Sequence, residues 1–282
     1  MIVKYVSGMN GKTFTLNKGY DLAIKECNPH TSTWTYESVS QQFGEKITSF
    51  GKEILEMDIR LKFRGTLDGI IENLNLFFEE CETDVINMVQ GSLWFDSEYI
   101  RGWFIERESV ASQEFYGWEQ QLTFIAPYPF YIREEKRSFL PAGKDTEKNT
   151  GTGLDYDYDY GYDYAAGAEG AKLWSIDHFA SSEFQMIIYG PCENPKVNIN
   201  GHPYEVFASL ETGEYLTIDS RSNTVIKHRV NGTDQNIYDL RGKKQTIFDK
   251  IPPGDLNIVW TAAFGFDLIL YLERGEPTWN LS

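Results

Sequence analysis

Apolar and polar residues alternate strictly over residues 53–64, and this pattern predicts a β-strand. The apolar side chains stand at every second position: Leu55, Met57, Ile59, Leu61 and Phe63. Charged residues fill most positions between them, so one face of the strand should be buried and the other solvated. A hairpin is predicted upstream, because residues 2–6 and 14–16 flank Asn10-Gly11, a strong turn signal.

A spacing of three and four residues follows and predicts one α-helix near residues 66–82. The apolar stripe consists of Leu67, Ile70, Ile71, Leu74, Phe77, Phe78 and Cys81. Thr66 is suited to the N-cap, and Asp68 suits the positive end of the helix dipole. The other acidic residues lie outside the stripe, with no lysine or arginine among them: Glu72, Glu79, Glu80 and Glu82.

Two long strand-like runs, residues 91–107 and 113–126, are rich in aromatic side chains. Pro127 and Pro129 then end the pairing, because proline cannot donate a ladder hydrogen bond. The runs carry more large apolar groups than one small domain readily hides. We therefore expect part of this surface to be buried between copies of the chain in a closed cyclic oligomer.

The composition changes in the middle of the chain and indicates two domains. Residues 1–138 form the first domain in this interpretation. Residues 139–171 form a linker that is poor in aliphatic side chains and contains the alternating Asp–Tyr run 155–164. Residues 172–282 form the second domain.

The second domain shows short strand-like runs separated by turns, with no helical stripe. The turn signals are Asn200-Gly201, Thr212-Gly213, 221–223, Asn231-Gly232 and 252–254. The predicted strands include 184–189, 196–199, 215–218, 256–260 and 266–272. Regular short spacing of this kind is typical of a β-sandwich or jelly roll, so the predicted fold class is mainly β with one helix.

The net charge is −16, and it is spread over the whole chain. Residues 1–140 hold 14 basic and 21 acidic residues, and residues 141–282 hold 12 and 21. A role in wrapping nucleic acid is disfavoured, because phosphate binding needs a basic surface. An acidic wall that DNA passes without sticking is compatible with this charge, and so is a charge that only keeps the protein dispersed.

The sequence offers no metal, disulfide or catalytic pattern. Cys27, Cys81 and Cys192 are odd in number and far apart, and we expect free, buried thiols. The histidines do not pair at metal-binding spacing: His30, His178, His202 and His228. No catalytic, cofactor-binding or metal-binding residue and no cofactor is therefore predicted.

The start of the chain lacks the apolar core of a signal peptide. No apolar run reaches the roughly 20 residues that a membrane span needs. We therefore expect no membrane insertion and a soluble, reducing compartment.

Three weaker patterns carry alternative chemistry. Asp96 and Glu98, two apart in a predicted strand, should face the same side and are the carboxylate pair that a glycosidase would need. The Asp–Tyr run suggests calcium binding or a connector ordered by a partner. Trp174, Tyr204 and Trp279 suggest sugar stacking, although such residues are more often core or interface.

Several short motifs, in order along the chain, resemble siphophage-type distal tail proteins, which are hub components of the phage tail tip. They are 102–104, 124–131, 188–191 with Asn194-Pro195, 199–202, 213–216, 251–254 and 276–279. The Asp–Tyr run is similar to the Tyr-Asp-Tyr-Pro repeats of relatives from phages of Gram-positive bacteria, but it has no prolines.

The resemblance implies a ring-forming N-terminal domain, six-fold by analogy, and a galectin-like β-sandwich behind it. It implies a structural role without enzymatic activity, in the virion tail tip of a phage or in a phage-derived particle, assembled in the bacterial host cytoplasm. The implied partners are other copies of the chain, the tail tube protein, the tail-tip or tail-associated protein and the receptor-binding protein. DNA would pass without specific binding. The alternative function is a carbohydrate-binding β-sandwich adhesion module.

Overall fold

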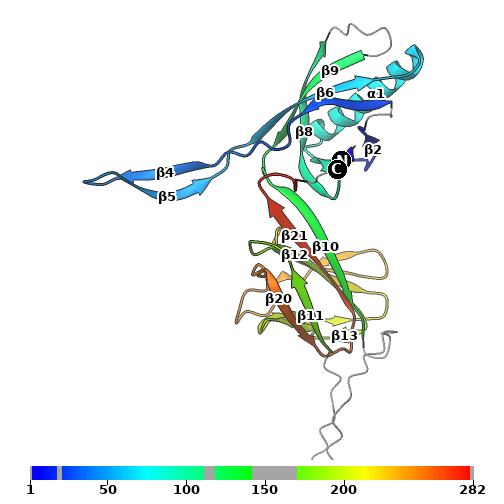
Figure 1. Cartoon of the computed structure of the whole chain (residues 1–282). Coiled ribbons are helices and arrows are strands. Elements are labelled where there is room, and N and C mark those ends of the chain that lie inside the picture. Colours follow the sequence, from blue (N-terminus) through cyan, green and yellow to red (C-terminus); the bar gives the residue numbers. More distant parts are fainter. Residues whose placement is uncertain (1, 18–20, 111–117, 142–169, 280–282) are drawn as a thin grey trace, which may run out of the picture. The chain divides into compact units, whose positions relative to one another are not determined.

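The computed structural model describes residues 2–17, 21–110, 118–141 and 170–279. The chain forms two compact units, and each has its own hydrophobic core (Figure 1). The first unit comprises Met1–Arg133 together with Glu273–Ser282, and the second comprises Glu134–Leu272. Most described residues are in strands, so the predicted mainly β class is confirmed.

The first unit is an antiparallel β structure with one described α-helix. Its elements are β1 (Val3–Val6), β2 (Thr13–Thr15), β3 (Leu22–Cys27), β4 (Thr35–Ser40), β5 (Glu45–Gly51), β6 (Leu55–Phe63), α1 (Leu67–Ile86), β7 (Gly91–Phe95), β8 (Glu98–Val110), β9 (Trp118–Ala126) and the start of β10 (Tyr131–Phe139). One layer has the strand order β2-β1-β7-β8, and the other has the order β3-β6-β9-β8. The long β8 pairs with β7 through its first residues and with β9 through the rest, so it joins the two layers.

Aromatic rings fill the core between these strands and α1. Tyr5, Phe77, Phe104 and Phe124 are buried, and neighbouring rings meet edge to face at centroid distances of 5.1–5.9 Å. Edge-to-face contacts add to the free energy that burial of the rings provides. Of the aromatic residues in the two predicted runs, Phe95, Tyr99, Phe104 and Phe124 are buried within the unit, whereas Trp118 is 47% exposed. Burial of the remaining aromatic surface between copies stays a prediction. Phe115 and Tyr116 lie outside the described residues.

Helix α1 confirms the predicted helix and extends it by about one turn. Thr66 is the N-cap and accepts a hydrogen bond from the Gly69 amide. Ile70, Leu74, Phe77 and Cys81 form the buried stripe. Leu67 and Ile71 were assigned to this stripe but are exposed, because the stripe that faces the sheet is narrower than the apolar pattern.

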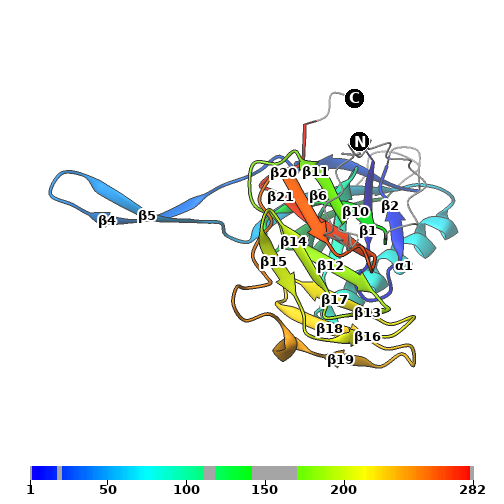
Figure 2. The same ribbon diagram turned by 90° about the horizontal axis from the view of Figure 1, so that it is seen from below.

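The second unit is a β-sandwich. Its elements are the end of β10, β11 (Gly170–Ile176), β12 (Glu183–Tyr189), β13 (Cys192–Glu193), β14 (Lys196–Ile199), β15 (His202–Glu205), β16 (Ser209–Leu210), β17 (Tyr215–Asp219), β18 (Thr224–His228), β19 (Asp234–Asn236), the 3-10 turn η1 (Tyr238–Leu240), β20 (Gly254–Trp260) and β21 (Phe266–Arg274). One sheet has the order β19-β18-β17-β12-β21, and the facing sheet has the order β11-β20-β14-β15 (Figure 2).

Alternate residues of both sheets point into one core. Phe184, Met186 and Leu268 come from the first sheet, and Ile258 and Trp260 come from the second. The predicted turns are confirmed where the backbone needs a positive φ, at Asn200-Gly201, Gly213, Asn223, Gly232 and Gly254. The second half of the chain is therefore a sandwich, as its short strands and turns predicted.

The unit boundaries differ from the predicted ones. Strand β10 runs without a break to Phe139, which is 2% exposed in the second core, so residue 139 is not linker. The charged stretch 133–137 has a linker-like composition, but it alternates on a strand, and Lys136 pairs with Asp267 at 2.7 Å. Residues 142–169, with the Asp–Tyr run, lie outside the described residues and connect two strands of the second unit. The last residues of the chain return to the first unit.

The run 91–107, predicted as one strand, is a hairpin. Strands β7 and β8 are joined at Asp96-Ser97, where Asp96 has φ of 55°. An aspartate tolerates the left-handed region better than most residues, which allows a turn here without glycine.

Candidate interaction surface

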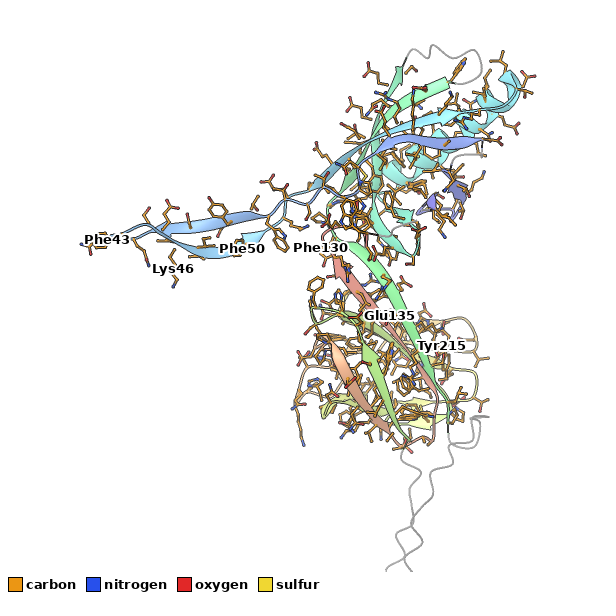
Figure 3. All side chains as sticks on the ribbon, in the orientation of Figure 1. Phe43, Lys46, Phe50, Phe130, Glu135 and Tyr215 are labelled. Atoms are coloured by element: carbon orange, nitrogen blue, oxygen red, sulfur yellow. The ribbon has the colours of Figure 1, made fainter. Side chains whose placement is uncertain are left out.

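The β4–β5 hairpin with its flanking residues, 34–54, is largely exposed, and we call it the arm. It projects from the body of the unit as a two-stranded ribbon (Figure 1). Every residue of β5 is exposed, as are five of the six residues of β4. Phe43 at the tip is 89% exposed, and Phe50 is 65% exposed (Figure 3).

The arm has one apolar and one polar face near its root. Tyr36 pairs with Phe50 across the strands, which places both rings on one face. The next pair, Glu37 and Ser49, points to the other face, and the Ser49 hydroxyl donates to the Glu37 carboxylate at 3.0 Å. Trp34 lies two residues before Tyr36, so an extended backbone places both rings on the same face. The arm can therefore lie with one face on an apolar surface while the other stays in water.

A cation and two aromatic rings form the root of the arm. The Lys52 ammonium lies 5.1 Å from the Trp34 ring centroid and 5.0 Å from that of Phe130, and it donates to the Ser32 hydroxyl at 2.7 Å. Burial lowers the pKa of Lys52, and the negative charge of Glu276 opposes this effect. Cation–π contacts at such distances fix the direction of a side chain. The root is therefore held in place, while the distal arm has no such contacts with the body.

A second exposed apolar surface lies at the end of α1. It consists of Met9 (53% exposed), Ile86 (79%) and Met88 (76%), with Val85 at 37%, and we call it the helix-end patch. The Asp84 carboxylate positions its backbone by accepting hydrogen bonds from the Gly8 and Met9 amides at 2.9 and 2.8 Å. These contacts connect the β1–β2 turn to the last turn of the helix, so the patch is a fixed surface.

The predicted carboxylate pair has structural contacts instead of catalytic geometry. Asp96 accepts a hydrogen bond from the Ile2 amide at 2.6 Å. Glu98, which is 4% exposed, accepts from the Thr278 amide at 2.7 Å and from the Thr278 hydroxyl at 2.5 Å. Asp96 lies in the turn and Glu98 in β8, so the two do not share a strand face as predicted. Glu98 instead holds the end of the chain on the first unit.

The three aromatic residues considered for sugar stacking lie in different places. Tyr204 is buried in the second core, and its hydroxyl donates to the Asp249 carbonyl at 3.0 Å. Trp174 packs against that core. Trp279 belongs to the first unit and stacks on His30 at a centroid distance of 3.7 Å. Tyr204 exposes no ring for a sugar and Trp279 is not part of the second unit, so the three residues do not form one stacking face of that unit.

Each histidine has an aromatic neighbour: His30 with Trp279, His178 with Phe179, His202 with Tyr204 and His228 with Tyr215. Within the described ranges, no group of three or more His, Cys, Asp or Glu side chains is arranged to hold a metal ion. No helix among the same residues is long and apolar enough to cross a membrane.

The three cysteines are free, and we expect their thiols to react slowly in the folded protein. Burial raises the pKa of Cys192 to about 11 and that of Cys27 to about 12, and it raises the pKa of Cys81 further. Only the thiolate reacts, so about 0.1% of Cys192 is reactive at pH 8. Labelling with a chromogenic thiol reagent should accelerate about tenfold per pH unit and become complete on unfolding. Rapid labelling of two thiols at pH 8 would contradict this prediction.

The arm was not predicted from the sequence. Its signal was weak but present: Trp34, Tyr36 and Val39 precede a polar turn with Gly44, and Ile47 and Phe50 follow it. The bulge between Glu37 and Ser38 breaks the period of two, so the apolar positions do not match across the hairpin. The helix-end patch had no sequence signal, because β1–β2 and α1 meet only in the fold.

The fold is similar to that of known phage proteins over nearly the whole chain. The crystal structure of the Dit protein (gp 19.1) of phage SPP1, described as a hub adsorption apparatus in phages infecting Gram-positive bacteria, has a TM-score of 0.58 at 8% identity. The alignment covers 97% of this chain and 100% of that one.

A chain of the phage P2 baseplate in its activated conformation with Ca has a TM-score of 0.61 at 12% identity, covering 98% of this chain and 100% of that one. The corresponding structure with Sr gives 0.62 at 12% identity, covering 98% and 99%. No protein-family model and no curated protein matches the sequence. The resemblance that the motifs indicated is thus confirmed for the fold: this chain has the two-unit fold of phage distal tail and baseplate hub proteins.

Proposed function

We propose that this protein is a non-enzymatic structural component of a phage tail tip, assembled in the host cytoplasm and retained in the virion. The observation that carries the proposal is the extent of the structural likeness. Both units align with hub and baseplate chains from end to end, so the match is not that of a common sandwich domain alone. A shared architecture of two different units constrains function more than one widespread fold does.

In this role, copies of the chain form a closed ring, and we propose six of them. The ring joins the tail tube protein to the tail-tip protein and the receptor-binding protein. The arm and the helix-end patch support assembly, because each exposes large apolar side chains that a monomer in water leaves unpaired. The carbohydrate-binding alternative gains no support from Trp174, Tyr204 and Trp279.

We expect the purified protein to assemble into rings of one rotational order. Light scattering at increasing concentration should give a mass of about six times the 32.5 kDa protomer, and electron micrographs should show annular particles. Glycan binding by monomers, without rings at any concentration or in particles, would favour the adhesion module instead. An intermediate mass with open arcs would contradict ring closure.

The ring should not retain DNA, because it lacks the positive charge that phosphate binding needs. The net charge is −16, and α1 exposes Asp68, Glu72, Glu79 and Glu82. Glu82 is offset by Arg107 at 3.3 Å, and the others have no basic residue beside them on the helix. Assembled rings mixed with duplex DNA at physiological salt should leave its electrophoretic mobility unchanged. Retained DNA would contradict passive passage.

A further inference from the structure

The arm lacks the contacts that usually hold a β-hairpin in shape. An isolated two-stranded hairpin is marginally stable in water, because it has no core. Beyond the Lys52 root, the arm has only its own ladder and a few exposed polar contacts, such as the Ser38 hydroxyl donating to Glu45 at 2.6 Å. Its large apolar side chains are nevertheless 48–89% exposed: Tyr36, Val39, Phe43, Ile47 and Phe50. These features indicate a segment that becomes buried against another surface.

The chain itself carries a surface of matching character. The helix-end patch is apolar and lies on α1 and the β1–β2 turn, whose backbone is held by the hydrogen bonds to Asp84. In both ribbon views, the arm leaves the first unit on the side away from α1 (Figures 1 and 2). The paired residues of β4 extend roughly 20 Å. Because the arm points away from its own patch, it can meet only the patch of another copy.

The register keeps charge away from the apolar face of the arm. Past the bulge, Ser38 pairs with Ile47, which places Ile47 on the same face as Tyr36 and Phe50. Lys46 pairs with Val39 and therefore lies on the opposite face. At the helix end, Glu82 is already paired with Arg107 at 3.3 Å. The contact is therefore apolar on both sides, and the charged groups stay in water.

We propose that the apolar face of the arm of one copy binds the helix-end patch of the next copy. The contact joins two different surfaces, so each copy uses its arm once and its patch once. Such heterologous contacts propagate in one direction and form a ring when the rotation closes. This inference rests on the proposed function, since it names the surfaces that assemble the ring.

The test uses full-length variants that are defective on one surface only. The arm variant is Phe43→Ser with Phe50→Ser, and the patch variant is Ile86→Ser with Met88→Ser. All four side chains are at least 65% exposed, so folding should not change, and circular dichroism checks this. Each variant alone should lower the ring fraction at least tenfold and leave monomers. The control, Val230→Ser, removes an apolar side chain that is 71% exposed in the second unit and should form rings normally.

Mixing the two variants gives the decisive measurement. The patch variant still has an intact arm, and the arm variant still has an intact patch, so the mixture should form heterodimers of about twice 32.5 kDa and no rings. Rings from either variant alone, or monomers only in the mixture, would overturn the arm-to-patch contact. If the unmodified protein forms no ring, the ring itself fails, and heterodimers in the mixture still test the contact.

A photoreactive phenylalanine analogue at position 43 identifies the surface that the arm meets. Cross-linked peptides from a second copy should fall within residues 2–17 or 79–90. Cross-links confined to other residues, or to a different protein in intact particles, would overturn the choice of partner while leaving the proposed tail-tip role in place.

Discussion

Replacing Asp84 with alanine is expected to destabilise the first unit by about 3–5 kcal/mol. Asp84 has no exposed surface, and its carboxylate accepts hydrogen bonds from the Tyr5 hydroxyl at 2.7 Å and from the Gly8 and Met9 amides. Alanine leaves three buried or half-buried donors without this acceptor. Burial raises the pKa of Tyr5 far above its ordinary value, and the hydrogen bond to Asp84 raises it further, so the hydroxyl stays a donor across the working pH range.

The measurement is urea unfolding, with hydrogen exchange of peptides from β1, α1 and β7 to assign the transition to the first unit. Tyr5→Phe should cost less, about 1–2 kcal/mol, because the carboxylate keeps its two amide donors. Glu82→Ala is the matched control on the same helix. Its carboxylate is exposed and pairs with Arg107, which is also exposed, so the change should stay below about 1 kcal/mol. Equal effects of Asp84→Ala and Glu82→Ala would show that the buried contacts contribute little.

The Asp84 contacts illustrate what the sequence can and cannot predict. The period of three and four residues predicted α1, and Thr66 predicted its start, because both signals lie within one element. Asp84 is one of several acidic residues in α1, and no feature of the neighbouring sequence distinguishes it from the exposed ones. Its burial follows from the approach of the β1–β2 turn, 75 residues away in the sequence. Long-range contacts of this kind also create the helix-end patch, so the candidate site was the least predictable part of the molecule.

The strands of the second unit were predicted well, because their turns carry strong local signals. Glycine or asparagine stands at nearly every position where φ is positive. The unit boundary was predicted poorly, because β10 carries charges on a strand that passes from one unit into the other. The residues of this stretch are mostly charged, as in a linker. Their exposed and half-buried positions alternate, as in a strand. Composition placed the end of the first domain at residue 138, whereas the first unit ends at Arg133 and the strand continues to Phe139.

Replacing Gly102 with alanine is expected to destabilise the first unit by about 3 kcal/mol. Gly102 is buried in β8, where the strand passes from its pairing with β7 to its pairing with β9. A Cβ atom there would overlap the carbonyl oxygen of Ile125 and come within 2.8 Å of its carbonyl carbon and of the Phe124 ring. Backbone atoms in a paired strand cannot move aside as a flexible side chain can, so the two strands must separate.

Thermal unfolding, together with hydrogen exchange of β8 and β9, measures this effect. Gly51→Ala is the matched control, because a Cβ atom at residue 51 would meet only the Thr35 hydroxyl at 3.4 Å, an ordinary contact. Its effect should stay within about 0.5 kcal/mol.

Gly91 in β7 pairs with Gly102 and is the second position of this strand pair that requires glycine. A Cβ atom at residue 91 would overlap the Tyr5 hydroxyl. That space lets Tyr5 reach Asp84, so Gly91→Ala should also weaken the Asp84 contacts, and Gly102→Ala should leave them intact. A similar loss of exchange protection around Asp84 in both variants would contradict this assignment.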